Sequence, residues 1–299
     1  MGVQVAIYVQ PQTWVSNSPC RSGMRRTSSA LGTPGRARYG QQMPQTSVDR
    51  RTSPPIGLPT LGVIGGMGPL ATADFLEKVT RATPARCDQE HIPLVLCSIP
   101  QIPDRTGAIL HGGSSPLPVL LRALKILESS GADYIAVPCN TAHFWHAQLQ
   151  ARSSVKILHI ADAVVAAIWA RGLRGSTVGL LATTATIEGR VYQRRLAAQG
   201  VRTIVPGADD QRALMSLIYR IKSGAPPAHP GEFDALISGL ASNGADAIVL
   251  GCTELPLIKT SECVGPLIDS TAALARLCVA HALDAHFWRA DDDGAEVAG

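Results

Sequence analysis

A short segment that carries one cysteine occurs twice in this chain of 299 residues. Residues 131–143 read GADYIAVPCNTAH and residues 244–255 read GADAIVLGCTEL, so the two copies share the frame G-A-D-x-I-x-x-x-C. In each copy an apolar run, which is typical of a buried strand, ends at a cysteine that polar residues follow. Cys139 and Cys252 therefore occupy equivalent places in two similar halves. Two thiols that face one cleft from opposite sides could take a proton from one face of a carbon and return a proton to the other face.

Cysteine suits this exchange because its free pKa of about 8.5 is lowered by helix N-termini and by cations. Each cysteine precedes an expected helix start, near Thr141 or near Glu254. Backbone N–H groups and hydroxyls at Asn140, Thr141 and Thr253 are placed to hold a carboxylate and to stabilise a growing enolate charge. Glu254 could orient the second cysteine or cap the helix, and both roles stay open. The alternative for both cysteines is a buried thiol without a chemical role, which does not explain their polar neighbours.

Two basic residues stand at similar distances before the two cysteines. Arg105 precedes Cys139 by 34 residues, and Lys222 precedes Cys252 by 30 residues. A planar guanidinium suits bidentate binding of a carboxylate. We therefore expect Arg105 and Lys222 to hold a substrate that carries two carboxylates. The alternative is a solvated surface cation, and Arg212 is a weaker candidate for the same role.

The formal net charge of +4 is unevenly distributed along the chain. Residues 1–60 hold seven arginines and one acid, a charge of +6, so the remaining residues carry −2. A mildly acidic body argues against a nucleic-acid surface, and an aromatic content of 4% argues against base-stacking platforms. No apolar run approaches the ~20 residues of a membrane span. The seven cysteines are odd in number and show no framework spacing, so free thiols in a reducing cytoplasm are expected.

The first 59 residues differ in composition from the rest of the chain. They are rich in Ser, Thr, Gln, Pro, Gly and Arg and show little apolar periodicity, so we expect an unstructured extension. An Arg- and Ser-rich, acid-poor segment is also typical of an organelle transit peptide. The other interpretations are a flexible bacterial tail and a start codon placed too early, with Met43 as a later start. A flexible acidic tail is expected at residues 288–299.

From Leu61 onward strands and helices alternate, which predicts parallel sheets covered by helices on both faces. The expected strands are residues 61–66, 93–98, 134–137, 157–160, 177–181, 203–205 and 247–250. The expected helices are residues 70–81, 116–130, 141–151, 161–171, 187–199, 209–222, 232–242 and 270–286. The pattern restarts near Thr177, because residues 178–189 repeat the strand, small-residue turn and helix of residues 61–72. The fold class is therefore α/β with two similar half-domains, residues 60–159 plus 268–287 and residues 160–267.

Two motifs were weighed as sites for a nucleotide or a metal. The glycines at 62, 65, 66 and 68 give G-x-x-G-G-x-G instead of G-x-G-x-x-G, so no dinucleotide site is expected. The backbone of this turn can still approach a ligand carboxylate, and Met67 within it is a predicted substrate-binding residue. His143 follows Cys139 by four residues, but a zinc site would need more Cys/His pairs, so no metal is expected. His143 and His146 are expected to pack or to tune the local field.

Six motifs in register resemble the aspartate/glutamate racemase family, close to its aspartate racemase branch, over about residues 60–287. They are GGMGPLAT, PDRT, PCNTAH, LLATTAT, IYRIKSG and GCTEL. The resemblance implies half-domains related by a pseudo-twofold axis, an active site in the cleft between them and no cofactor. It implies a two-base racemisation of aspartate, or of glutamate or other amino acids, in which Cys139 and Cys252 exchange the acid and base roles. Thr183 and Thr186 resemble family hydroxyls at the second turn, and their alternative role is an N-cap.

Several other functions stay open at this point. A hydantoin racemase, a maleate isomerase or a malonate decarboxylase would share the fold, although a decarboxylase needs only one cysteine. A module that binds a small ligand without catalysis and a redox protein with a Cys139–Cys252 disulfide are further alternatives. Arg105 and Lys222 favour a small dicarboxylic amino acid as the partner. We expect a cytoplasmic enzyme, compatible with a homodimer, that binds neither nucleic acid nor membrane.

Overall fold

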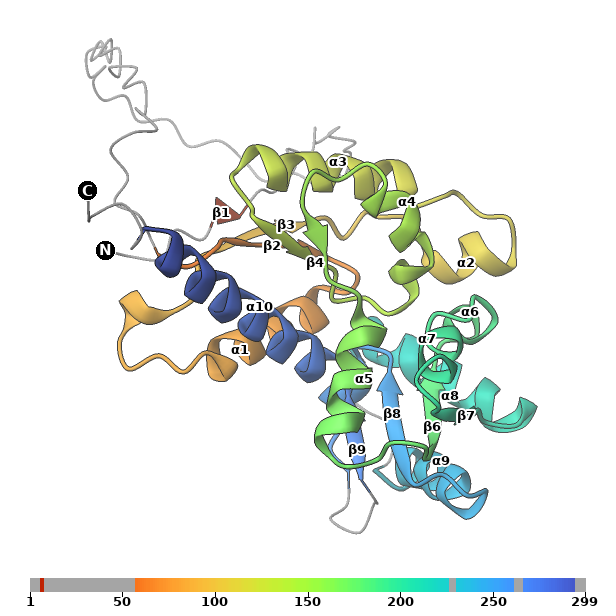
Figure 1. The fold of residues 1–299 in the computed structure, drawn as a ribbon. Coiled ribbons are helices and arrows are strands. Elements are labelled where there is room, and N and C mark those ends of the chain that lie inside the picture. The colour runs from red at the N-terminus through yellow and green to blue at the C-terminus, as the bar shows by residue number, and fades with distance from the viewer. Residues whose placement is uncertain (1–5, 8–56, 226–229, 261–265, 294–299) are drawn as a thin grey trace, which may run out of the picture. The chain divides into compact units, whose positions relative to one another are not determined.

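A computed structural model describes residues 6–7, 57–225, 230–260 and 266–293 (Figure 1). Every strand pair in it is parallel, and the described strands form two sheets. The first sheet has the order β1-β3-β2-β4-β5, and the second has the order β7-β6-β8-β9. The strands are β1 (Ala6–Ile7), β2 (Leu61–Gly65), β3 (Leu94–Ser98), β4 (Tyr134–Ala136), β5 (Lys156–Ile157), β6 (Thr177–Ala182), β7 (Arg202–Ile204), β8 (Ala247–Gly251) and β9 (Leu267–Asp269).

Helices cover both sheets, which confirms the predicted α/β class. Before β6 they are α1 (Pro69–Ala82), α2 (Arg105–Leu110), α3 (Leu117–Ser129), α4 (His146–Gln150) and α5 (Ile160–Ala170), with 3-10 turns η1 (Asp88–Glu90) and η2 (Thr141–Trp145). After β6 they are α6 (Thr184–Glu188), α7 (Gln193–Ala197), α8 (Ala208–Lys222), α9 (Pro230–Ser242), the 3-10 turn η3 (Leu255–Leu257) and α10 (Ser270–Asp293). None of the helices in the described ranges is long and apolar enough to cross a membrane.

The two halves wind their strands in the same order. Beginning with β2 in one half and β6 in the other, each half has four described strands in chain order. In both sheets the second strand lies beside the first, followed by the third and the fourth, which gives β3-β2-β4-β5 and β7-β6-β8-β9. The third strands, β4 and β8, are those of the repeated G-A-D segments. This shared topology supports the duplication that the sequence predicts.

The repeated aspartate makes the same hydrogen bonds in both halves. The backbone N–H of Asp133 donates to Thr60 O, and Asp133 Oδ2 accepts from Thr60 N at 2.7 Å. Asp246 forms the same pair of bonds with Thr177, with its Oδ2 at 2.8 Å from Thr177 N. Each aspartate thus fixes the start of the neighbouring strand relative to the strand that leads to a cysteine.

The glycine of each repeated segment has a conformation that other residues rarely adopt. Gly131 has φ +84° and Gly244 has φ +89°, both in the left-handed region that favours glycine. Each glycine ends the turn after a helix, α3 or α9, before the chain enters the third strand. The G-A-D frame therefore encodes a helix end, a turn and a strand anchor.

The apolar core continues across both halves. One cluster contains residues of β2 and β4, residues of β6 and β8, and the helices α1, α5 and α10. A second cluster lies between the first sheet and α3, and a third lies between the second sheet, α8 and α9. In Figure 1, α10 runs beside α1 and reaches α5, and it contacts both helices. The sheets are consequently covered on both faces, and one layer of helices serves both halves.

The structure departs from the predicted elements in several places. The expected helix 187–199 is two short helices, α6 and α7, because the chain turns at Gly189–Arg190, where Arg190 has φ +52°. The strand expected at 157–160 is limited to β5, and the helix expected at 141–151 begins as the 3-10 turn η2. Helix α2 and strand β9 were not predicted.

Both predicted flexible ends differ from the structure where it describes them. Residues 6 and 7 of the extension form β1, which pairs with β3. The rest of residues 1–56 lies outside the described ranges. Helix α10 continues to Asp293, so the first residues of the expected acidic tail are helical, and residues 294–299 lie outside the described ranges.

Candidate active site

The two repeated cysteines follow the carboxyl ends of β4 and β8, the third strands of the two halves. Cys139 follows β4 and Cys252 follows β8, so each lies where ligands bind in open α/β sheets. Both are free thiols in this structure, and each is 4% exposed. A Cys139–Cys252 disulfide is therefore not formed here.

Lys222 links the cysteines of both halves electrostatically. It is the last residue of α8, and its ammonium interacts with Glu254, Cys252 and Cys139 and is repelled by Arg105. Burial lowers the pKa of Lys222, but nearby Glu254, with smaller effects from Cys252 and Cys139, raises it above its usual value. Lys222 Nζ lies 4.0 Å from Glu254 Oε1, and the other carboxylate oxygen of Glu254 accepts from Cys252 Sγ. The structure thus brings the two predicted cations and the two cysteines into one neighbourhood.

Glu254 makes the closest contact of the second thiol. Cys252 Sγ donates to Glu254 Oε2 at 3.0 Å, and Thr253 Oγ1 donates to the same oxygen at 3.3 Å. Glu254 Oε1 lies 4.0 Å from Lys222 Nζ and is buried without a hydrogen-bond partner. Glu254 precedes η3, but its side chain makes no cap hydrogen bond. Of its two open roles, the structure supports orienting the cysteine.

The pKa of Cys252 is shifted opposite to the expected direction. Burial and then the negative charge of Glu254 raise it well above the usual thiol value, although Lys222 lowers it. The expected lowering is therefore outweighed by burial and by Glu254, and the segment after Cys252 is the short 3-10 turn η3. Cys252 is therefore a neutral thiol in this environment.

Arg105 is a buried cation that faces backbone carbonyls. Its Nη1 donates to Ile102 O at 3.3 Å and to Pro103 O at 3.2 Å, and its Nη2 donates to Met67 O at 3.4 Å. Its Nε is buried without a hydrogen-bond partner. Within the described ranges no carboxylate forms an ion pair with this guanidinium, and a buried unpaired charge is costly. The Nε consequently lacks the hydrogen-bond partner that an anion could supply.

Met67 contributes to the site through its backbone. Its carbonyl accepts the hydrogen bond from Arg105, whereas its side chain is 2% exposed and packs in the core below the first sheet. The Asp104 side chain accepts from Gly107 N at 2.6 Å and caps α2, which places Arg105 in the first turn of that helix. Substrate contact by Met67 stays a prediction that concerns its backbone.

Three buried threonine hydroxyls meet between the first cysteine loop and the second half. Thr141 Oγ1 lies 3.0 Å from Thr183 Oγ1 and 2.9 Å from Thr186 Oγ1, and the last two are 2.8 Å apart. Thr183 Oγ1 also accepts from Thr186 N at 3.2 Å, so the N-cap role is confirmed for Thr183. Each hydroxyl has one hydrogen, so a carboxylate would have to attract one of them away from this trio.

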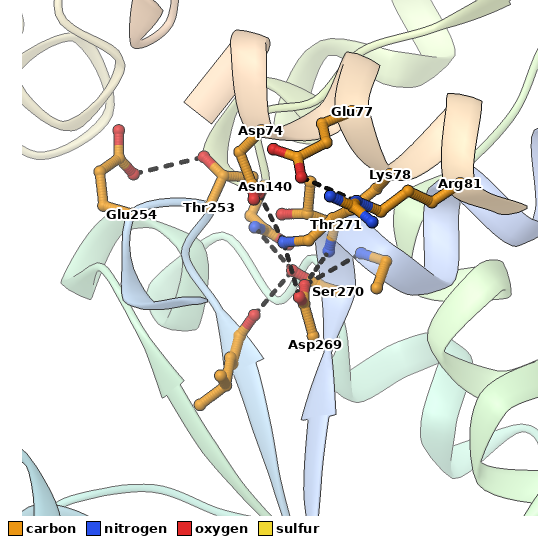
Figure 2. Close-up of polar contacts among 12 residues, drawn as sticks. Asp74, Glu77, Lys78, Arg81, Asn140, Thr253, Glu254, Asp269, Ser270 and Thr271 are labelled. Carbon is orange, nitrogen blue, oxygen red and sulfur yellow. Dashed lines mark hydrogen bonds and ion pairs between the residues drawn. The ribbon is translucent and has the colours of Figure 1, made fainter. Parts of the chain in front are cut away.

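The amide of Asn140 bonds residues that are distant in the sequence. Its Nδ2 donates to Ser270 Oγ at 3.2 Å, and Tyr192 Oη donates to its Oδ1 (Figure 2 draws the Ser270 contact). One amide hydrogen and one lone pair remain for a substrate. Sequence reasoning missed Ser270 and Tyr192. The strand that Ser270 follows, β9, has only three residues, so the sequence carried no clear signal for this position.

The His143 ring contacts the backbone of the first cysteine loop. Its Nε2 accepts from Ile160 N at 3.1 Å, so the neutral ring carries its hydrogen on Nδ1 and donates it to Cys139 O at 2.9 Å. Burial lowers the pKa of His143 to about 4. The rings of His146 and His159 pack beside it at centroid distances of 5.9 and 4.7 Å. In the part of the chain that the structure describes, no group of three His, Cys, Asp or Glu side chains is arranged to hold a metal.

Two other features lie away from this site. Arg212 is exposed and pairs with Asp209 one turn earlier on α8, so it does not join the buried cations. A hollow of about 700 Å³ is lined by Thr177, Arg202 and Gly244, among others. These residues mark the amino ends of β6, β7 and β8, the opposite sheet edge from the cysteines.

Comparison with known proteins gives consistent matches. The sequence profile of the Asp/Glu/hydantoin racemase family matches residues 64–278. The broad specificity amino-acid racemase RacX of Bacillus subtilis is 31% identical over 229 residues, which cover 73% of this chain and 96% of that protein. The structure of Picrophilus torridus aspartate racemase is similar at 34% identity and TM-score 0.65, covering 75% of this chain and 94% of that one. The structure of an aspartate racemase homologue from Pyrococcus horikoshii matches at 27% identity and TM-score 0.60, covering 75% and 99%.

Proposed function

Because this chain belongs to the Asp/Glu/hydantoin racemase family and is thereby an amino-acid racemase, we propose that it interconverts L- and D-aspartate through Cys139 and Cys252. Glutamate and other amino acids are proposed as further substrates, because RacX is named for broad specificity. The resemblance that six motifs predicted is confirmed at the level of the family. The choice of substrate and the two-base mechanism are our proposals.

The observation that supports the mechanism best is the neighbourhood of Lys222. Its ammonium interacts with a cysteine from each half, with Glu254 and with Arg105. A two-base racemase needs two proton-carrying groups around one carbon, and thiols that belong to one shared site meet this requirement. The cysteines also follow equivalent strands of two similarly wound sheets, so they approach from different halves.

The charge of the site favours a dicarboxylate substrate. Arg105 and Lys222 repel one another, and of the two only Lys222 lies near a protein carboxylate among the described residues. A substrate with two carboxylates would relieve this repulsion and would supply the missing partner of Arg105 Nε. Asparagine or alanine offers only one carboxylate. We therefore propose that Arg105 and Lys222 bind the substrate carboxylates.

The proposed proton transfers use the two cysteines in opposite senses. For one enantiomer the Cys139 thiolate takes the α-proton, and the Cys252 thiol donates its proton to the opposite face of the carbanion. For the other enantiomer the Cys252 thiolate is the base and the Cys139 thiol is the acid. A Cys252 thiolate would lie beside the Glu254 carboxylate, so the Lys222 ammonium is needed to stabilise it. The hydroxyls of Thr141, Thr183 and Thr253 and the Asn140 amide are proposed to assist substrate binding.

Exchange of the α-hydrogen with solvent tests this function directly. Single enantiomers of aspartate, glutamate, asparagine and alanine would be incubated with the protein in deuterated water, without added pyridoxal phosphate, metal or nucleotide. Proton NMR would follow loss of the α-hydrogen, and chiral chromatography would follow the enantiomer ratio. We expect deuterated product of inverted configuration from aspartate. A ligand-binding module would bind aspartate without exchange, and activity that a chelator or a carbonyl reagent abolishes while the thiols stay intact would refute the cofactor-free reaction.

A further inference from the structure

A short series of polar contacts connects the two cysteine loops. Asn140, the neighbour of Cys139, donates from Nδ2 to Ser270 Oγ at 3.2 Å. Ser270 Oγ in turn donates to Leu250 O at 2.6 Å, two residues before Cys252. Figure 2 shows Asn140 and Ser270 joined in this way. One hydroxyl therefore stands between the loop of the first cysteine and the strand that leads to the second.

These groups are shielded from water and their hydrogen bonds are specific. Ser270 and Tyr192 are fully buried, and Asn140 is 2% exposed. Ser270 has one hydrogen, which goes to Leu250 O, so it can only accept from Asn140. Tyr192 Oη donates to Asn140 Oδ1, which fixes the orientation of the amide. The direction of every bond is thus determined, and no water can replace a lost partner without entering the core.

Ser270 itself is held relative to both halves. The preceding residue, Asp269, accepts from Thr271 N at 2.8 Å and Ala272 N at 3.0 Å through Oδ1, which fixes the first turn of α10. Its Oδ2 pairs with Lys78 of α1 at 2.7 Å (Figure 2). Strand β9, which ends at Asp269, belongs to the second sheet, whereas α1 packs on the first. The serine hydroxyl is therefore a fixed point between the halves.

We propose that Ser270, together with Asn140 and Tyr192, is a positioning group that sets the separation of Cys139 and Cys252. This inference rests on the proposed two-base function. Abstraction of the α-proton needs one correctly placed thiolate, whereas inversion needs both sulfur atoms aligned on one carbon. A misplacement of about 1 Å can lower a rate by about 100-fold. Loss of the Ser270 bridge consequently impairs inversion more than it impairs abstraction.

The test compares inversion with deuterium uptake by the unconverted enantiomer. The substrate is whichever amino acid the wild-type protein racemises, in deuterated water. In Ser270→Ala we expect racemisation to fall by roughly tenfold or more, while the ratio of deuterated unconverted substrate to inverted product rises at least several-fold. Tyr192→Phe removes one hydroxyl of the same network and should change the ratio in the same direction by less. Melting temperatures of all variants establish that they fold.

Thr271→Val provides a matched control in the same helix turn. Thr271 is fully buried, but its Oγ1 makes no hydrogen bond, so the variant removes a neighbouring hydroxyl without breaking the bridge. Its ratio of exchange to inversion should equal that of the wild type. If Ser270→Ala and Tyr192→Phe lower exchange and inversion by the same factor, or change neither, the positioning role is refuted. Absence of both reactions in the wild type would instead refute the proposed function.

Discussion

Replacing Arg105 by alanine should convert a preference for dicarboxylates into near indifference. Arg105 is 9% exposed, its guanidinium donates to three backbone carbonyls, and its Nε has no partner. A carboxylate that accepts from the Nε edge would therefore form a desolvated, charge-assisted contact that water screens little. Asparagine has nearly the same shape as aspartate but a neutral side chain. A comparison of the two substrates therefore isolates the effect of the side-chain charge.

The size of the effect follows from the burial of Arg105. Removing one partner of a buried, hydrogen-bonded charge pair costs about 2–5 kcal/mol. At about 1.4 kcal/mol per factor of ten, kcat/KM for aspartate should fall by roughly 30-fold to several thousand-fold. The value for asparagine should fall by much less, so the ratio of the two is the decisive quantity. For Arg105→Lys, kcat/KM for aspartate should lie between the values of the wild type and of Arg105→Ala, because an ammonium keeps the charge but loses the bidentate geometry.

Initial rates from chiral chromatography on both amino acids, over a range of concentrations, provide the assay. Arg212→Ala is the control, since it removes an exposed cation that pairs with Asp209 on the surface of α8, where ion pairs contribute at most about 1 kcal/mol. The control should leave both substrates within about threefold of the wild type. Equal losses for aspartate and asparagine in Arg105→Ala would refute our reasoning. Arg105 would then hold the α-carboxylate or only support the loop.

Three further outcomes are expected. Cys139→Ser and Cys252→Ser should each abolish racemisation, because a hydroxyl is a much weaker base than a thiolate. The two variants should retain exchange of the α-hydrogen for deuterium on opposite enantiomers. Racemisation at the wild-type rate in both variants, or exchange of the same enantiomer by both, would contradict the two-base mechanism. Glu254→Gln removes a charge that helps to raise the pKa of Cys252. For the enantiomer that Cys252 deprotonates, kcat should therefore begin to rise at a lower pH. An unchanged pH profile of kcat would exclude this electrostatic role. Burial lowers the pKa of His143 to about 4. Its neutral ring therefore contributes up to about 3 kcal/mol to the free energy of unfolding above about pH 6.5, and this contribution is lost as the pH falls towards 4. A urea midpoint that is unchanged between about pH 7 and about pH 4.5 would refute this.

The repeated segment was the most reliable guide to the fold, and its physical basis explains why. Gly131 and Gly244 need a left-handed backbone, and Asp133 and Asp246 each bond the start of the next strand. The glycine requirement is local, whereas the aspartate bonds join residues 73 and 69 positions apart and are visible in sequence only because the G-A-D frame occurs twice. The strand and helix alternation is also visible in sequence, because both sheets are covered on both faces and their strands are continuous apolar runs.

Elements that depend on distant contacts could not be predicted in this way. Strand β9 has three residues, too few for periodicity, and exists because it pairs with β8. The break between α6 and α7 places Tyr192 under Asn140, a contact across 52 residues. The raised pKa of Cys252 was missed because burial and the side-chain direction of Glu254 are tertiary properties. Helix α2 was within reach, since Asp104 caps it through a bond to Gly107 three residues later.

The placement of α10 has a consequence for how the first half acquires its structure. The helix that covers α1 and α5 follows the strands of the second half in the chain, and Tyr134 donates its hydroxyl to Cys278 O across 144 residues. Without α10, the apolar faces of α1 and α5 are exposed, and the first sheet lacks part of its cover. The earlier half is therefore not expected to be a stable body by itself, even though it is wound like the later half. Two similarly wound halves therefore differ in one respect, because the first is completed by a helix that lies beyond the second in the chain, and such distant contacts slow folding.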